Sequence, residues 1–339
     1  MPTTQSQTID WDASAPASPT RRCVCGILIV TALLFVFATP GFSAGYAQYD
    51  GGPKVAIAPR DMLPSRGPSA THPDLRMDVD LVQIPVTVTD PWDRPVTNLR
   101  LDSFRLYEDD IEQKITSIQV EDGPVSVGFI LDASSSMKTR MAPSIAAIKL
   151  FLETTDPGDE FFLIRFNDRP TLVTGLTRES KEILDDLPSV RAEGWTALLD
   201  AICFGVQELK GAKNKRKALF VLSDGGDNSS RYTESEVRSL VRESDLQLYA
   251  VGLFERPRFL AKLAADTGGE SLWVHKLKSL PEAIERISRS LRDHYVLGYS
   301  SNNSRTDGKY RRIRIELLPS MLRNPLNIVW RRGYYAPAK

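Results

Sequence analysis

The chain has 339 residues, of which 42% are hydrophobic, so it is long and apolar enough to build the core of one large domain or two ordinary ones. Its 43 basic residues are balanced by 43 acidic ones, which excludes an overall electrostatic field that attracts nucleic acid or an anionic membrane. A charged partner must therefore be recognised locally.

The N-terminal segment has the pattern of an export signal. Arg21 and Arg22 precede an uncharged apolar run, residues 23–38, which helix breakers and small residues follow. The run is shorter than the roughly 18 residues of a spanning helix. Residues 1–47 are therefore expected to be a cleaved signal peptide or, alternatively, a retained signal anchor. The arginine pair also hints at twin-arginine export. We expect an exported protein of the periplasm, the cell envelope or the extracellular space.

Residues 48–75 and 76–122 differ sharply in pattern. The first segment is rich in Pro, Gly and Ser and has no hydrophobic period, which predicts a disordered linker. The second alternates apolar and polar positions, which predicts β-strands, the last two of them around an acidic hairpin turn. The carboxylates of this turn are those of Glu108, Asp109 and Asp110, and a cation site is the alternative interpretation of them.

Strand-like runs return in residues 295–339. Each flank is too short to form a stable sheet alone, because an isolated hairpin is marginal in water. The two flanks are therefore expected to pair in one β-sandwich-like module.

Residues 123–294, between the flanks, alternate buried strands with helices, the last of which is expected to include His294 and Tyr295. Such alternation predicts a doubly wound, mostly parallel sheet covered by helices on both faces. The continuous buried strand predicted over 125–132 is expected at the centre of that sheet. The predicted fold class is therefore α/β, a Rossmann-like domain inserted in the β-sandwich-like module.

Cys203 is the one cysteine outside the export segment, so the mature chain has no partner for an intramolecular disulfide. It lies in an apolar helical pattern. We interpret it as a small buried residue rather than a reactive thiol.

Polar side chains follow the ends of several predicted strands of this domain. They are Asp132, Ser134 and Ser136 after the first strand, Asp224 after a later one, and Thr196 at a helix start. Ligands of open α/β sheets bind outside the carboxyl ends of the strands, so we expect these five side chains to converge. Their hard oxygens suit Mg²⁺ or Mn²⁺. The alternative is that they only cap helices.

The three loops resemble the metal-ion-dependent adhesion site of von Willebrand factor type A (VWFA) domains. The similar strings are DASSS at 132–136, GWT at 194–196 and LSDG at 222–225. The chain as a whole is similar to the bacterial secreted VWFA-related proteins, through YEDD at 107–110, SDGGDNSSR at 223–231, TGG at 267–269, HYVLGY at 294–299 and RRGYY at 331–335.

This resemblance implies the VWFA fold over about 123–294 and metal-ligating roles for Asp132, Ser134, Ser136, Thr196 and Asp224. The sequence departs from the family pattern at Ser135 and at Asp110, where glycine is common. The first departure leaves the ligating side chains intact. The second affects a turn whose last residue often needs a positive φ.

Family members use the metal to bind a partner's carboxylate, so the resemblance implies an exported adhesion or assembly module whose partner is a protein with an exposed Asp or Glu. Trp195, Met137 and Asn228 neighbour the site and are expected to contact the partner. Trp195 is the expected anchor, because large aromatic residues dominate interface energetics. The alternative is a ring packed under the loop.

Two other functions compete with binding. A metal-assisted hydrolase needs a base near the metal. His275 is expected on an edge strand and His294 in the last helix, and Ser134 lies in no G-x-S-x-G motif. We therefore expect a protein that is not an enzyme. The other competing function is that of a structural envelope component, which holds the ion for stability alone.

Overall fold

The computed structural model describes residues 81–96, 98–256, 258–318 and 325–338. The predicted export segment and linker lie outside these described residues. In chain order the strands are β1 (Leu81–Thr89), β2 (Phe104–Glu108), β3 (Ile111–Gln113), β4 (Ile115–Glu121), β5 (Val125–Asp132), β6 (Glu160–Phe166), β7 (Pro170–Thr177), β8 (Arg216–Ser223), β9 (Gln247–Leu253), β10 (Ser271–Val274), β11 (His294–Ser300), β12 (Tyr310–Leu317), β13 (Asn327–Trp330) and β14 (Gly333–Tyr335). The helices are α1 (Met141–Leu152), α2 (Ser180–Asp186), α3 (Leu198–Glu208), α4 (Glu234–Glu243), α5 (Arg258–Thr267) and α6 (Leu280–Arg292). None of these described helices has the length and apolarity needed to cross a bilayer.

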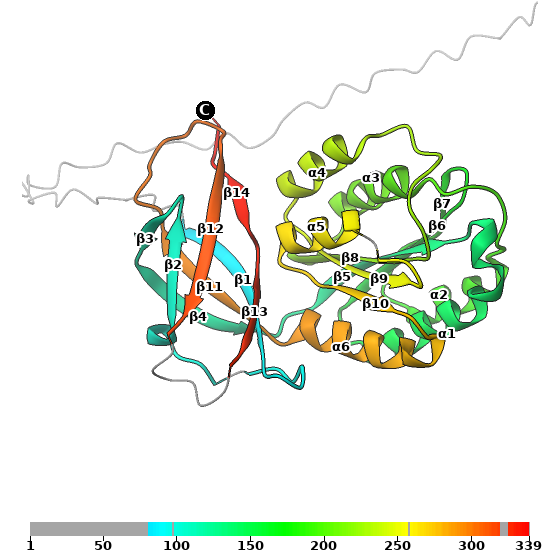
Figure 1. Ribbon diagram of the computed structural model, residues 1–339, viewed down its shortest axis with the longest axis horizontal. Helices are drawn as coiled ribbons and strands as arrows, with labels where there is room; N and C mark the ends of the chain where they lie inside the picture. The colour runs from blue at the N-terminus through cyan, green and yellow to red at the C-terminus, as the bar shows by residue number, and fades with distance from the viewer. Residues whose placement is uncertain (1–80, 97, 257, 319–324, 339) are drawn as a thin grey trace, which may run out of the picture. The chain divides into compact units, whose positions relative to one another are not determined.

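A six-stranded sheet in the order β10-β9-β8-β5-β6-β7 forms the centre of the α/β domain. Every neighbouring pair is parallel except β6 and β7. Figure 1 shows α1, α2 and α6 on one face of the sheet and α3, α4 and α5 on the other. All eight residues of β5 are buried, because this strand lies between two others and under helices on both faces. The predicted α/β fold class, with its central first strand, is confirmed.

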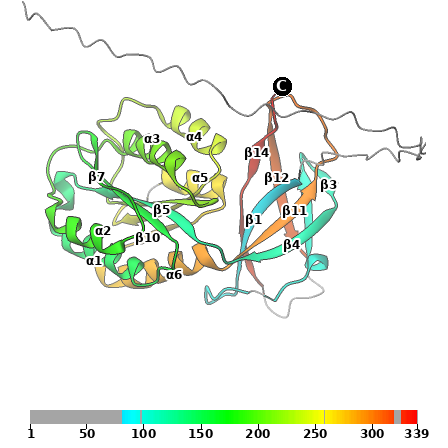
Figure 2. The ribbon, with the colours of Figure 1, turned by 180° about the vertical axis from the view of Figure 1, so that it is seen from behind.

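The flanking strands form two four-stranded sheets, in the orders β13-β1-β11-β4 and β14-β12-β2-β3. Each sheet combines strands that precede the α/β domain with strands that follow it, as Figure 2 shows from behind. Ile84, Leu106, Tyr299 and Ile313 belong to a single apolar core between the sheets. The predicted sandwich with an inserted domain is therefore confirmed as the fold.

Two sequence predictions about these elements are wrong. The last helix ends at Arg292, and His294 begins β11, where it pairs with Glu121 of β4. The segment expected to form two strands around the acidic turn forms three. A break at Lys114 separates β3, which pairs with β2, from β4, which pairs with β11 in the other sheet. The chain changes sheets at this break.

The acidic turn joins β2 to β3, and its three carboxylates do not act as one group. Asp109 and Asp110 have φ angles of 46° and 68°, as a tight turn between antiparallel strands requires. Glu108 is buried and accepts hydrogen bonds from the hydroxyls of Tyr299 at 2.6 Å and Ser301 at 2.7 Å. Its carboxylate therefore satisfies polar groups of the sandwich core.

Candidate metal site

Asp132 is the last residue of β5, and its side chain is fully buried at the carboxyl edge of the sheet. One carboxylate oxygen accepts a hydrogen bond from the backbone N–H of Ser134 at 2.9 Å, and the other accepts from the hydroxyl of Ser223 at 2.6 Å. Burial raises the pKa of the Asp132 carboxyl, although these hydrogen bonds oppose the shift. A buried carboxylate at this edge therefore favours a positive charge nearby.

A row of hydroxyls leads from the first loop to Asp224. The Oγ atoms of Ser134 and Ser136 lie 3.0 Å apart, and the Ser136 hydroxyl donates to Oδ1 of Asp224 at 2.8 Å. The other oxygen of Asp224 accepts from the guanidinium of Arg140, which also lies 4.4 Å above the centre of the Phe254 ring. The edge of the sheet thus already attracts a cationic side chain.

The second loop is joined to the other two by backbone hydrogen bonds. The N–H of Ser135 donates to the carbonyl of Gly194 at 3.1 Å. The N–H of Thr196 donates to the side-chain oxygen of Asn228 at 2.8 Å, and the N–H of Asn228 donates back to the carbonyl of Thr196 at 3.0 Å. The structure therefore brings all three loops, which carry the five predicted residues, to one edge of the sheet, and Thr196 is held there by its backbone.

The helix-cap alternative does not describe these side chains. Ser134 is the N-cap residue of a short 3₁₀ helix, Ser135–Thr139, but its side chain makes no capping hydrogen bond. The N-cap residue of α3 is Ala197, not Thr196. The hydroxyl of Ser134 contacts Ser136 instead of a helix N-terminus.

The three residues predicted to contact a partner have different positions. Trp195 is 67% exposed, so the alternative of a ring packed under the loop is wrong. Asn228 is exposed as well as hydrogen-bonded to the second loop. Met137 is fully buried, because the 3₁₀ helix turns its side chain into the apolar core that also includes residues of β5 and α1. The prediction of Met137 as a partner contact is therefore wrong.

Sequence reasoning missed several residues that shape this edge. Asp168 follows β6, and its carboxylate accepts from the N–H of Trp195 at 2.8 Å. It lies against Gly194, whose φ of 75° and close approach to that carboxylate exclude a side chain there. The position of Asp168 after a parallel strand next to β5 was a usable signal. No signal in the sequence indicated the contacts of Arg140 with Asp224 and Phe254, because these contacts join three separate loops.

The donor set fits a hard divalent cation. It consists of two carboxylates and three hydroxyls, with no sulfur or nitrogen donor, which suits Mg²⁺ or Mn²⁺. Among the described residues, no group of three or more His, Cys, Asp or Glu could hold a metal ion, at this edge or elsewhere. A site at this edge therefore depends on the hydroxyls as much as on the carboxylates.

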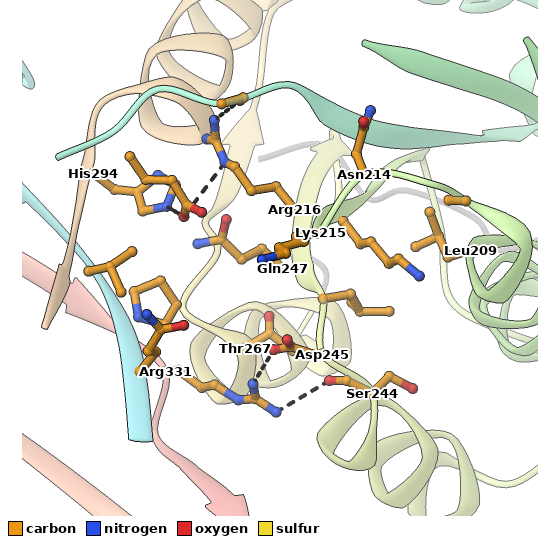
Figure 3. Close-up of a pocket in the computed structure, with 18 of the residues that line it drawn as sticks. Leu209, Asn214, Lys215, Arg216, Ser244, Asp245, Gln247, Thr267, His294 and Arg331 are labelled. Carbon is orange, nitrogen blue, oxygen red and sulfur yellow. Dashed lines mark hydrogen bonds and ion pairs between the residues drawn. The ribbon is translucent and has the colours of Figure 1, made fainter. Parts of the chain in front are cut away.

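A cavity of about 900 Å³, shown in Figure 3, is lined by none of the five predicted metal-site residues. It lies at the amino ends of β8 and β9, against the outer face of the sheet that contains β1, β4 and β11. Its charged groups are partly paired: Arg331 contacts Asp245 at 2.7 Å, and the imidazole of His294 contacts Glu121 at 3.1 Å. The oxygen-rich loops lie at the opposite, carboxyl ends of the strands.

One residue of this cavity holds the junction between the two folded parts. The chain passes between sandwich and α/β domain twice, before β5 and after α6. The guanidinium of Arg216 donates to the carbonyl of Gly123 in the first crossing and to that of Leu291 beside the second. The two crossings are therefore adjacent.

Residues 127–226, which include all three loops, match a family model described as the von Willebrand factor type A domain. The chain is also 24% identical to the inter-alpha-trypsin inhibitor heavy chain H4 of Bos taurus over 241 residues. That match covers 60% of this chain and 26% of the relative, so the chain spans about a quarter of the relative's length.

Several solved structures are similar to parts of the chain. Proximal thread matrix protein 1 from the mussel byssus is 19% identical with a TM-score of 0.48, over 55% of this chain and 51% of that one. A second structure of that mussel protein has a zinc-occupied MIDAS motif, and it is 19% identical with a TM-score of 0.45, over 54% and 49% of the two chains. A von Willebrand factor type A protein from Catenulispora acidiphila is 13% identical with a TM-score of 0.46, over 78% and 75%.

Proposed function

Because residues 127–226 match the von Willebrand factor type A domain model, we propose that the chain is an exported adhesion or assembly protein that binds an acidic side chain of a partner protein through a divalent cation. One observation carries this proposal. The loops after β5 and β8 and before α3 are hydrogen-bonded together, with a row of oxygens from Ser134 through Ser136 to Asp224 and with Asp132 buried behind it.

In this proposal Mg²⁺ or Mn²⁺ is held by Asp132, Ser134, Ser136, Thr196 and Asp224. When bound, the cation supplies a positive charge with an open coordination position, which attracts a carboxylate. The neighbouring residues position the site and contact the partner. Asn228 fixes the backbone of Thr196, and Trp195 and Asn228 contact the partner beside the cation. The proposed domain keeps the predicted start at residue 123 but ends before His294, which begins β11 of the sandwich, and export rests on the pattern of residues 1–47.

Hydrolysis is a weaker proposal, because it requires a base near the hydroxyls. The two histidines of the described residues lie elsewhere. His275 follows the edge strand β10, three strands from β5, and His294 is buried in the sandwich beside Glu121. We therefore propose that the protein is not an enzyme.

Binding to a set of short peptides tests this function. With the full chain immobilised in Mg²⁺, peptides that carry Asp or Glu are expected to bind, and matched peptides with Asn or Gln are not. Chelation, Asp132→Ala, Thr196→Ala and Asp224→Ala should each abolish binding. Asp185→Ala, which removes an exposed carboxylate of α2, should leave it unchanged. Binding that survives chelation and all three site substitutions would mean that the partner uses another face.

A further inference from the structure

Phe254 adopts a conformation that its residue type disfavours. It directly follows β9 and has a φ of 67°, a region that bulky side chains rarely enter. The N–H of Glu255 donates to the carbonyl of Leu253 at 2.8 Å, which closes a three-residue turn around Phe254. Turns of this kind with positive φ are rare and strained.

The strain at Phe254 is not accompanied by full burial of the ring, because the residue is 41% exposed. Glycine would adopt the same backbone conformation without steric strain. The visible contact of the ring is with the guanidinium of Arg140, which also binds Asp224. Backbone strain tends to persist at functional sites, and this aromatic ring stands next to the candidate metal site.

Trp195 has the matching position on the other side of that site. Its N–H is fixed by Asp168, in the loop that follows β6. The strand order here is β9-β8-β5-β6. The strands β8 and β5 lead to the carboxylates of Asp224 and Asp132. They lie between β9, which leads to Phe254, and β6, whose following loop binds the N–H of Trp195. The edge thus has one exposed aromatic ring on either side of the two carboxylates that are proposed to hold the cation.

The spacing of this row defines a segment length. Neighbouring strands are about 4.8 Å apart, so β6 and β9 are separated by about 14 Å. An extended chain rises about 3.4 Å per residue, so four residue steps cover the same span. Residues two positions before and two positions after a central residue also project to the same side of an extended chain as that residue.

We propose that Phe254 and Trp195 are the two anchors of one binding surface, which takes an extended segment of a partner protein with an acidic side chain between two apolar ones. The acidic side chain faces the cation and Arg140, and the apolar side chains at the second position on either side cover the two rings. This inference rests on the proposed function and adds the class of segment that the site selects.

A peptide selection on the full chain tests the inference. The probe is a phage-displayed library of nonapeptides with a fixed central Asp, bound in Mg²⁺ and eluted with a chelator. We expect aromatic and aliphatic residues to be enriched at the second positions on both sides of the Asp. Trp195→Ser and Phe254→Gly should each abolish the enrichment on one side, and each should weaken the best peptide about tenfold.

The matched control is Trp92→Ser. Trp92 is 68% exposed and also contacts an arginine, but it lies in the turn after β1 of the sandwich. This variant should keep both enrichments. Phe254→Gly should unfold at about the same temperature as the wild type, because the strain that glycine removes offsets its greater loss of backbone entropy.

Three results would overturn the inference. Chelator-eluted peptides without a preference at the second positions, or with preferences that both variants keep, would leave the proposed function standing and reject the two anchors. A lower unfolding temperature of Phe254→Gly would make Phe254 a structural residue. A complete lack of chelator-eluted peptides would reject the proposed function and this inference together.

Discussion

At the scale of single residues, Asp132 determines how the candidate site responds to metal. Its carboxylate is buried and is met by two neutral donors, the Ser134 N–H and the Ser223 hydroxyl. Neutral donors only partly replace the solvation that a carboxylate loses on burial. The folded chain should therefore gain stability when a divalent cation binds.

We expect Mg²⁺ at about 100 times its Kd to raise the free energy of unfolding by about 2.7 kcal/mol, because it binds the folded state alone. Asp132→Ala should remove this increase. Thermal unfolding with Mg²⁺ and with chelator measures it. The variant also leaves the donors of Ser134 and Ser223 without their acceptor, which lowers the free energy of unfolding by about 1–3 kcal/mol. The quantity compared between variant and wild type is therefore the increase caused by Mg²⁺, not the free energy of unfolding itself. A gain retained by Asp132→Ala, or lost in Asp185→Ala, would contradict the expectation.

The sequence predicts the position of those site residues that lie at or directly after the end of a predicted strand. Asp132, Ser134 and Asp224 follow strands that pattern alone identifies, so their convergence could be predicted. The burial of Met137 could not, because it depends on the short 3₁₀ helix that rotates the side chain inward. The contact of Arg140 with Asp224 joins residues 84 positions apart and needed the folded chain.

At the scale of elements, Asp266 ties α4 to α5. Its carboxylate accepts from the guanidinium groups of Arg238 at 2.6 Å and Arg242 at 2.9 Å, and its carbonyl accepts from the N–H of Arg332 beside β13. Burial acts to raise the pKa of the Asp266 carboxyl, but the two guanidinium groups outweigh it and hold the pKa below its ordinary value of 3.8.

We expect Asp266→Asn to lower the free energy of unfolding by about 2 kcal/mol at pH 7, because two partly buried guanidinium groups lose their anion. A lowered pKa stabilises the folded state above pH 3.8 and loses that contribution as the pH falls below it. The difference in free energy of unfolding between variant and wild type, measured by urea unfolding, should therefore decrease as the pH falls below about 4. Glu285→Gln, in an exposed pair with Arg289, should cost less than about 0.5 kcal/mol. A difference that is independent of pH would contradict this role of Asp266.

Element boundaries at the two crossings were harder to predict than the elements themselves. The pattern places β5 and the helices of the α/β domain, because their apolar periods are local. The sequence pattern around His294 fits the end of a helix and the start of a strand equally well. Its pairing with Glu121, 173 residues earlier, decides for the strand.

At the scale of the whole molecule, the sandwich depends on strands from both ends of the described chain. β11 pairs with β1 on one side and with β4 on the other, and β12 pairs with β2. The strands before the α/β domain therefore lack their neighbours until the last part of the chain has been made.

We expect a chain that ends at Asp293 to lose the fold of β1 and β4 while β5 and β8 keep theirs. Hydrogen exchange should show fast exchange in the first pair and protection in the second, because only the sandwich loses paired strands. A chain in which residues 124–292 are replaced by a few glycines should regain protection in β1, because Glu121 and His294 are neighbours across the sheet. Protection of β1 in the truncated chain would contradict this dependence.

The adjacent crossings held by Arg216 have a mechanical consequence. β5 runs from the first crossing to Asp132, so a partner held at the site pulls on the end of a strand about 25 Å long whose other end is the tether. Its neighbours β6 and β8 are parallel to it, so tension along β5 loads their hydrogen bonds together in shear rather than one after another. The second crossing, from α6, shares the load. The inserted domain is thus anchored at the end opposite its candidate site, by two links that are pulled in the same direction.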